Sequence, residues 1–150
     1  MGFFSNLFGK KTSSIRSLAQ LEFLEVDMHN HLLPGIDDGS NSVQQSLHYI
    51  QELQRLGLKK FICTPHIMAG VHQNTKFSIE HAKDSLVAGL KKSGNDVDIF
   101  GAAEHMIDEN LSLLIRENEL CVMPGGYVLI EMSYLSESKA LFHTILNIQK

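Results

Sequence analysis

The segment VDMHNHLLPGIDDGS, residues 26–40, concentrates histidines, aspartates and turn-forming residues directly after an apolar stretch. The residues just before it, EFLEVDM over 22–28, indicate a short strand, and the Pro-Gly and Asp-Gly pairs indicate that a loop follows. Alternate residues of an extended segment face the same side, so the imidazoles of His29 and His31 are expected to point at one site. The segment therefore predicts a strand that ends in a possible metal-binding pair.

The rest of the chain repeats a pattern of strand followed by helix. Apolar residues from 42 to 56 recur at helical spacing and stop at Gly57, and similar alternation continues to the C-terminus. We expect strands over 22–28, 60–64, 97–103 and 127–133, and helices over 42–56, 78–93, 108–118 and from 138 to the end. Strand-helix units in succession predict an α/β fold with a parallel sheet and right-handed crossovers, either open or curled as part of a barrel.

Composition limits the class of protein. The chain has 150 residues, 43% of them hydrophobic, which suits one core and a single domain. Its formal net charge of -4 comes without a basic stripe, so nucleic-acid binding is not expected. Cys63 and Cys121 lie far apart in apolar stretches, which indicates core thiols in a reducing, cytoplasmic compartment. The sequence has no apolar run long enough to span a membrane.

The first 20 residues differ in character from the rest. Phenylalanines and a leucine precede Lys10 and Lys11, but the segment lacks the basic leader and cleavage site of a secretion signal. It is expected to be a flexible tail or a short amphipathic piece whose contact with a membrane or partner is at most peripheral. The folded domain is then expected over 21–150.

Polar residues of the metal-ligand type mark the ends of the other predicted strands. His66 follows Pro65 after the second strand, Glu104 follows the third, and Glu131 lies in the fourth. The carboxyl ends of parallel strands meet at one edge of a sheet, where α/β proteins build their sites. We therefore expect these side chains to converge with the histidine pair of the first strand.

The chemistry of such a cluster follows from its ligands. Imidazoles and carboxylates without thiolates favour Zn, Mn or Fe, and bridging carboxylates can hold two ions about 3.5–4 Å apart. One ion lowers the pKa of a bound water to give hydroxide, while another holds a phosphoryl oxygen. The pattern therefore predicts metal-dependent hydrolysis of a phosphoester.

Other residues of the same types are open to simpler interpretations. Asp37 and Asp38 can be ordinary turn residues, because Asp-Gly is a common turn pair. Three histidines fall on predicted helices and are expected at the surface: His48, His81 and His143. His72 lies in a predicted loop, and His105 is expected to point away from Glu104, so neither is assigned to the site.

Taken together, the motifs resemble those of the polymerase-and-histidinol-phosphatase (PHP) superfamily. They are DMHNH (27–31), LPGIDDG (33–39), TPH (64–66), AE (103–104) and IE (130–131). More narrowly, the HxLPGIDDG pattern is similar to that of the bacterial capsule-type tyrosine phosphatases. The resemblance covers the chain from about residue 22 to its end. It implies the N-terminal part of a distorted, TIM-like PHP barrel with a trinuclear metal site, usually described with manganese.

The resemblance also implies a function and roles for single residues. The function is hydrolysis of phosphotyrosine on a protein, a bacterial tyrosine autokinase that controls synthesis of capsular or extracellular polysaccharide, by metal-activated hydroxide. Asp27 would orient a ligating histidine. Six residues would be metal ligands: His29 and His31 at one metal, Asp38 and His66 at another, and Glu104 and Glu131 binding or bridging metals.

This sequence also departs from that family. The resemblance implies a further histidine, an arginine-bearing segment and an Asp-x-His pair that do not occur here, and the two arginines beyond the N-terminal segment, Arg55 and Arg116, fall on predicted helices. The chain is therefore expected to be truncated at its C-terminus, and activity without those elements is left open.

Other functions remain as alternatives. One is a small-molecule phosphoesterase of the histidinol-phosphatase type; a related amidohydrolase is disfavoured because Glu131 stands where such enzymes normally have a lysine. Another is an inactive remnant or interaction module. Homo-oligomerisation is also left open.

Overall fold

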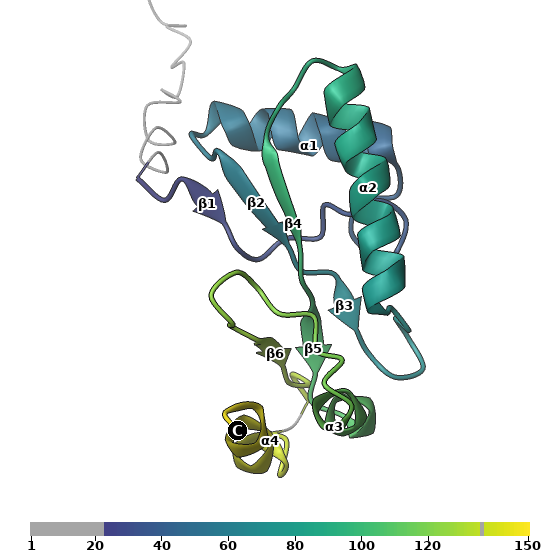
Figure 1. The fold of residues 1–150 in the computed structure, drawn as a ribbon, viewed down its shortest axis with the longest axis vertical. Coiled ribbons are helices and arrows are strands. Elements are labelled where there is room, and N and C mark those ends of the chain that lie inside the picture. Colours follow the sequence, from purple (N-terminus) through teal and green to yellow (C-terminus); the bar gives the residue numbers. More distant parts are fainter. Residues whose placement is uncertain (1–22, 136) are drawn as a thin grey trace, which may run out of the picture.

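The computed structural model describes residues 23–135 and 137–150 (Figure 1). The tail predicted over residues 1–20 lies outside the described residues. Helices separate the strands as the sequence predicts, except that the second and third strand regions each contain two strands. The elements are β1 (Val26–Asp27), α1 (Val43–Arg55), β2 (Lys60–Cys63), β3 (His66–Ile67), α2 (Lys76–Lys92), β4 (Asp98–Gly101), β5 (Glu104–Met106), α3 (Glu109–Arg116), β6 (Leu129–Glu131) and α4 (Leu141–Ile148).

The strands form two parallel sheets instead of the single sheet expected. One has the order β1-β2-β4 and the other the order β3-β5-β6, and every pair in both is parallel. Between β2 and β3 the chain passes through Pro65, which has no N–H to donate to a sheet. Backbone hydrogen bonds still cross the break, from Ala102 N to Cys63 O (2.8 Å) and from Glu104 N to Pro65 O (3.0 Å). The second sheet therefore continues the first.

The first strand is much shorter than the predicted range of 22–28. Glu25 has a φ of +54°, a left-handed conformation that ends an extended run. Beyond Asp27, hydrogen bonds that involve side chains interrupt the regular backbone ladder. Only Val26 and Asp27 therefore pair as strand residues with β2.

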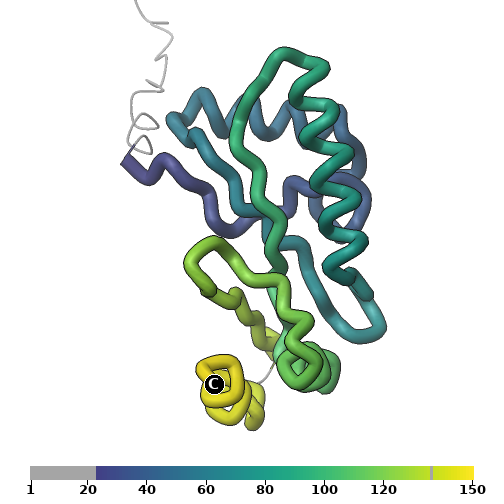
Figure 2. Tube along the Cα trace, viewed as in Figure 1, coloured from purple at the N-terminus to yellow at the C-terminus, as the bar shows by residue number. Residues whose placement is uncertain are grey.

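Two helices cover the first sheet. α1 begins at the N-cap Ser42, whose side chain accepts a hydrogen bond from the backbone N–H of Gln45. α1 packs against α2, and α2 packs against β4. Gly89 allows this close crossing, because a Cβ there would collide with the side chain of Val43. α4 lies at the end of the molecule opposite α1 (Figure 2).

The core lies mainly between the first sheet and these helices. Alternate residues of β2 face opposite sides: Phe61 and Cys63 join the main cluster, while Ile62 joins a smaller one. The predicted core thiols are confirmed, since Cys63 and Cys121 are both buried and free. Burial raises the pKa of the Cys121 thiol to about 11. None of the helices in the described part of the chain has the length and hydrophobicity of a membrane span.

His105 ties the second sheet together from within the protein. Its side chain is fully buried, and Nδ1 donates to Leu129 O (3.2 Å). Nε2 accepts from the backbone N–H of Cys121 (3.3 Å). One neutral tautomer satisfies both contacts, whereas a protonated ring would turn a second donor toward the Cys121 N–H. Burial accordingly lowers the pKa of His105.

Acidification should therefore destabilise the metal-free protein through His105. The folded state resists protonation of this ring, whereas the unfolded chain takes up the proton near the ordinary histidine pKa of about 6.5. The free energy of unfolding should fall as the pH is lowered through that value. Urea denaturation in a chelator, above and below it, measures the slope. His105→Gln should give a shallower slope, and equal slopes for the two proteins would contradict this origin.

Candidate metal centre

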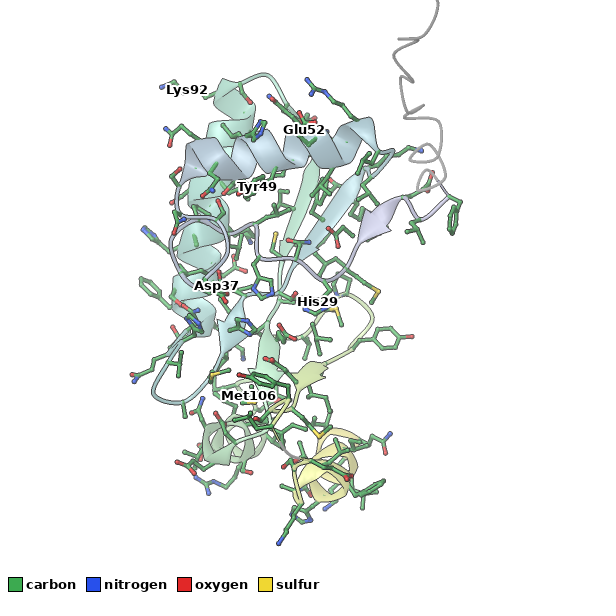
Figure 3. All side chains as sticks on the ribbon, turned by 180° about the vertical axis from the view of Figure 1, so that it is seen from behind. His29, Asp37, Tyr49, Glu52, Lys92 and Met106 are labelled. Atoms are coloured by element: carbon green, nitrogen blue, oxygen red, sulfur yellow. The ribbon has the colours of Figure 1, made fainter. Side chains whose placement is uncertain are left out.

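The structure brings all six predicted ligands together near the ends of the strands. Figure 3 shows His29 and Asp37 between α1, which carries Tyr49 and Glu52, and Met106 of β5. The ligands form three overlapping groups, and within each group one potential ligand atom per residue lies within 4.8 Å of the others. The groups are His29, His31 and Glu104; His31, Asp38 and His66; and His66, Glu104 and Glu131.

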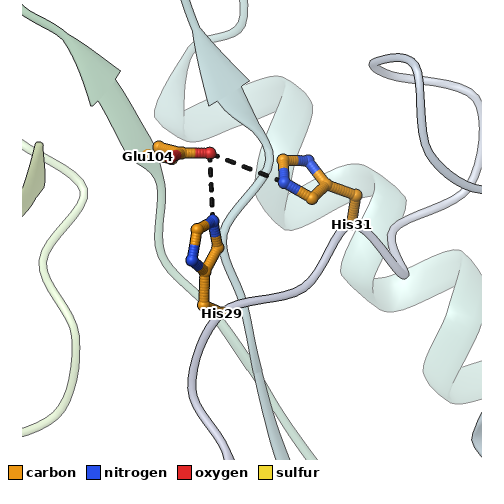
Figure 4. Close-up of side chains that lie close together, drawn as sticks. All are labelled: His29, His31 and Glu104. Atoms are coloured by element: carbon orange, nitrogen blue, oxygen red, sulfur yellow. Dashed lines mark ion pairs between the residues drawn. The ribbon is translucent and has the colours of Figure 1, made fainter. Parts of the chain in front are cut away.

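Glu104 is the residue that joins these groups. Its Oε2 lies 3.2 Å from His29 Nε2 and 3.5 Å from His31 Nε2 (Figure 4). The same oxygen lies 3.3 Å from His66 Nδ1. The Glu104 side chain is only 8% exposed. A single buried carboxylate oxygen thus faces three imidazoles, and this arrangement suits a carboxylate that bridges cations.

Asn30 aims the histidine pair at the centre. Its Nδ2 donates to Ile62 O (3.2 Å), and its backbone N–H donates to the Thr64 hydroxyl (3.2 Å). The backbone N–H of Thr64 donates back to Asn30 O (2.9 Å). Because Asn30 points to the neighbouring strand, the residues on either side of it, His29 and His31, turn to the opposite side. No role was predicted for Asn30 from the sequence, although its place between the histidines is consistent with this alternation.

Asp37 orients one of these imidazoles. Its carboxylate is fully buried, and Oδ2 lies 2.7 Å from His31 Nδ1 and accepts the backbone N–H of His66 (3.2 Å). A proton held on His31 Nδ1 by this carboxylate leaves the Nε2 lone pair directed at Glu104. The resemblance to the capsule-type phosphatases implied an orienting role for Asp27. Asp27 Oδ1 accepts the backbone N–H of His29 (3.2 Å), so its contact with a histidine is through the main chain.

His66 and Glu131 provide the strongest evidence for a bound cation. His66 Nδ1 and Glu131 Oε2 lie 3.2 Å apart, and both atoms are buried without a hydrogen-bond partner among the described residues. Buried polar atoms seldom lack partners, and a cation between these two would satisfy both. The other nitrogen of His66, Nε2, lies 3.7 Å from Asp38 Oδ1. A neutral imidazole has one lone pair, so His66 can be a ligand in only one of its two groups.

The charge of the cluster also suits divalent ions. All the ion pairs that the structure gives to Glu104 and Glu131 are with histidines. The described arginines pair elsewhere, Arg55 with Glu52 and Arg116 with Glu117. Buried carboxylates need a compensating cation, and the oxygen and imidazole donors favour Mn, Zn or Fe. The residues present therefore fit a metal centre.

Gly39 shapes the loop that holds the centre. The backbone N–H of Ser40 donates to His31 O (3.0 Å), which brings Gly39 against His31. A Cβ at position 39 would collide with the Cβ and the carbonyl oxygen of His31. Any side chain at Gly39 must therefore displace a predicted ligand.

Gly39→Ala should accordingly weaken both folding and metal binding. Overpacking against backbone should lower the free energy of unfolding by about 1–3 kcal/mol. Mn²⁺ affinity, measured by calorimetry, should fall as His31 shifts. Gly94→Ala is the matched control: its Cβ would meet nothing within 4 Å although its φ is +74°, so it should affect folding only. Unchanged Mn²⁺ affinity in Gly39→Ala would contradict the prediction.

The fold and the cluster define a parallel α/β protein with a candidate centre for several divalent ions at the ends of its strands. The chain belongs to the capsular polysaccharide synthesis CpsB/CapC family, whose model matches residues 25–150. This family membership agrees with the resemblance to capsule-type phosphatases seen in the sequence.

Two bacterial proteins resemble most of this chain. The chain is 27% identical over 117 residues to the tyrosine-protein phosphatase YwqE of Bacillus subtilis, covering 73% of this chain and 43% of YwqE. It is 25% identical over 111 residues to CapC of Staphylococcus aureus, covering 71% of this chain and 42% of CapC. The chain thus spans less than half the length of these relatives.

The fold matches a solved structure of the same kind. The structure comes from work on YwqE of Bacillus subtilis and CpsB of Streptococcus pneumoniae, described as unique metal-dependent tyrosine phosphatases. The TM-score is 0.75 at 25% sequence identity, with 83% of this chain and 51% of the other chain covered. The mixed α/β arrangement with parallel strands is therefore shared with that structure.

Proposed function

We propose that this chain provides the metal-binding part of a manganese-dependent tyrosine-protein phosphatase. Its substrate would be phosphotyrosine on a protein, a bacterial tyrosine kinase of capsule synthesis, in the cytoplasm. Residues 21–150 would be a PHP-type domain and form part of its barrel. The observation that carries the proposal is the convergence of His29, His31 and His66 on the buried Glu104 carboxylate.

Each part of the centre has a role in this proposal. Glu104 would bridge ions, the paired histidines of the first loop would hold one of them, and Glu131 would hold another. Asp37 keeps His31 in the tautomer that presents Nε2. When bound, the divalent ions would stabilise charge on the phosphoryl oxygens and lower the pKa of the attacking water.

The exposure of the ligands supports a substrate presented from outside. The side chain of His29 is 52% exposed and that of Asp38 71%, whereas that of Glu104 is 8% exposed. The centre is thus buried on the side of Glu104 and open on the side of the first loop. A phosphate carried on a protein surface can approach from this open side.

Phosphatase assays on the purified chain test the proposal. The chain is stripped with a chelator, titrated with Mn²⁺ and given a phosphotyrosine peptide. We expect release of phosphate that requires Mn²⁺ and falls by about 100-fold or more in Glu131→Gln, since even residues that only support metal ligands contribute 10–100-fold. Glu137→Gln, outside the candidate metal centre, is the matched control.

The assay also separates the alternatives. Preferential hydrolysis of histidinol phosphate would support the small-molecule phosphoesterase in place of the tyrosine phosphatase. Binding of Mn²⁺ without turnover of either substrate would contradict phosphatase activity of this chain and favour an inactive module.

A further inference from the structure

A fourth imidazole continues the row of rings in the metal centre. The ring centroids of His29 and His31 lie 5.8 Å apart, and those of His31 and His66 lie 4.6 Å apart. The ring of His72 stacks on that of His66, at 5.4 Å and 17°. The first three histidines are predicted ligands, whereas His72 belongs to none of the three ligand groups. His72 therefore lies beside the centre without being part of it.

The backbone fixes the position of His72. The loop after β3 turns back on itself, with hydrogen bonds from Met68 N to His72 O (2.8 Å) and from His72 N to Met68 O (3.0 Å). Gly70, with a φ of +75°, makes the turn between them. Asn74 Nδ2 then donates to His66 O (2.9 Å), which ties the end of the loop to the strand. The loop thus holds the His72 ring next to His66 through its main chain.

The nitrogens of His72 remain available for a ligand. Within the described ranges 23–135 and 137–150, no hydrogen bond or ion pair joins its ring to another residue, and the residue is partly exposed. An imidazole carries at least one N–H in either tautomer and in the protonated form, so it can donate whatever its charge.

Phosphate sites in proteins commonly use N–H donors as well as metal ions. Phosphoryl oxygens are bound in proteins by N–H groups, most often those of arginine and lysine. The described arginines pair with glutamates on outer helices, and Lys76, at the other end of the same loop, pairs with Glu119 (3.0 Å). His72 adjoins the cluster through its ring contact with His66, carries a donor, and has no hydrogen-bond or ion-pair partner among the described residues.

We propose that His72 donates a hydrogen bond to a phosphoryl oxygen of the substrate and so positions the phosphomonoester against the metal centre. The inference rests on the proposed function, because it requires a phosphate at the ions. The loop between β3 and α2 would then contact the substrate directly.

Three substitutions in the full chain test this role. His72→Ala removes ring and donor, His72→Phe keeps the stacked ring without a donor, and His72→Gln keeps a donor. Calorimetry measures Mn²⁺ binding first and then binding of inorganic phosphate to the Mn²⁺-loaded protein. We expect unchanged Mn²⁺ affinity throughout, phosphate affinity about tenfold lower in the first two variants, and partial recovery in His72→Gln. The exposed His48, replaced by alanine, is the control.

Each of the other outcomes would contradict the inference, and each points to a different cause. Phosphate binding by His72→Phe at the level of the unsubstituted chain would show that the donor is not used. A fall in Mn²⁺ affinity in His72→Ala would show that His72 acts through the metal. Unsubstituted chain that binds Mn²⁺ but not phosphate would overturn this inference alone, whereas failure to bind Mn²⁺ would overturn the proposed function with it.

Discussion

Glu104→Gln is expected to lower the affinity of the chain for Mn²⁺ by more than about 100-fold, which exceeds the loss usual for residues that only support ligands. The Glu104 carboxylate oxygen faces three imidazole nitrogens, so its replacement affects every group that shares it. Glutamine keeps the size of the side chain but removes its negative charge. Isothermal titration calorimetry with Mn²⁺ measures the change.

Stability without metal distinguishes a functional carboxylate from a structural one. A buried carboxylate that awaits a cation is costly, so Glu104→Gln should leave the chelator-treated protein at least as stable as the unsubstituted chain. Glu109→Gln, at an exposed position in the first turn of α3, is the matched control and should bind Mn²⁺ normally. Equal Mn²⁺ affinities in Glu104→Gln and Glu109→Gln would contradict the role given to Glu104.

Mn²⁺ itself should stabilise the fold strongly. An ion present at about 100 times its Kd adds about 2.7 kcal/mol to the free energy of unfolding, provided it binds only the folded chain. For a protein of this size, the gain corresponds to a rise in Tm of roughly 5–10 °C. Scanning calorimetry with Mn²⁺ and with chelator measures the difference.

Scanning calorimetry of Glu104→Gln shows whether a rise in Tm comes from Mn²⁺ bound at the candidate metal centre. Its Tm should change little with Mn²⁺, because the shared ligand is missing. A Tm of the unsubstituted chain that does not depend on Mn²⁺ would count against the metal centre and favour an interaction module. A rise of equal size in both proteins would place the binding elsewhere in the chain.

The helices were the most predictable part of the fold. The first was expected over 42–56 and spans Val43–Arg55, because apolar spacing, an N-cap serine and a glycine stop all act locally. The strands were located less well. Pro65 ends the second strand where the sequence predicts, but β3 and the late start of β1 at Val26 were not predicted. The pairing of these segments depends on hydrogen bonds to distant parts of the chain, which no local pattern contains.

The residues of the candidate metal centre were likewise predictable only in part. The sequence placed His66 and Glu104 just after strands, and in the structure they begin β3 and β5, where parallel pairing sets them side by side. Glu131 ends β6, the next strand of the same sheet. The loop after β1 was harder, because adjacent Asp37 and Asp38 have the same chemistry. Only the folded loop shows that Asp37 is buried against His31 while the Asp38 side chain is 71% exposed.

Ions bound in the centre would connect the two sheets of the structure. His29 and His31 extend from β1 of the first sheet, whereas Glu104 and Glu131 lie on strands of the second. Ions shared by these residues would act as cross-links between the two sheets, in addition to the chain connections from β2 to β3 and from β4 to β5. Without ions, we expect β6 to open more readily than the first sheet, which α1 and α2 cover. Amide hydrogens of β6 would then exchange with solvent sooner than those of β2.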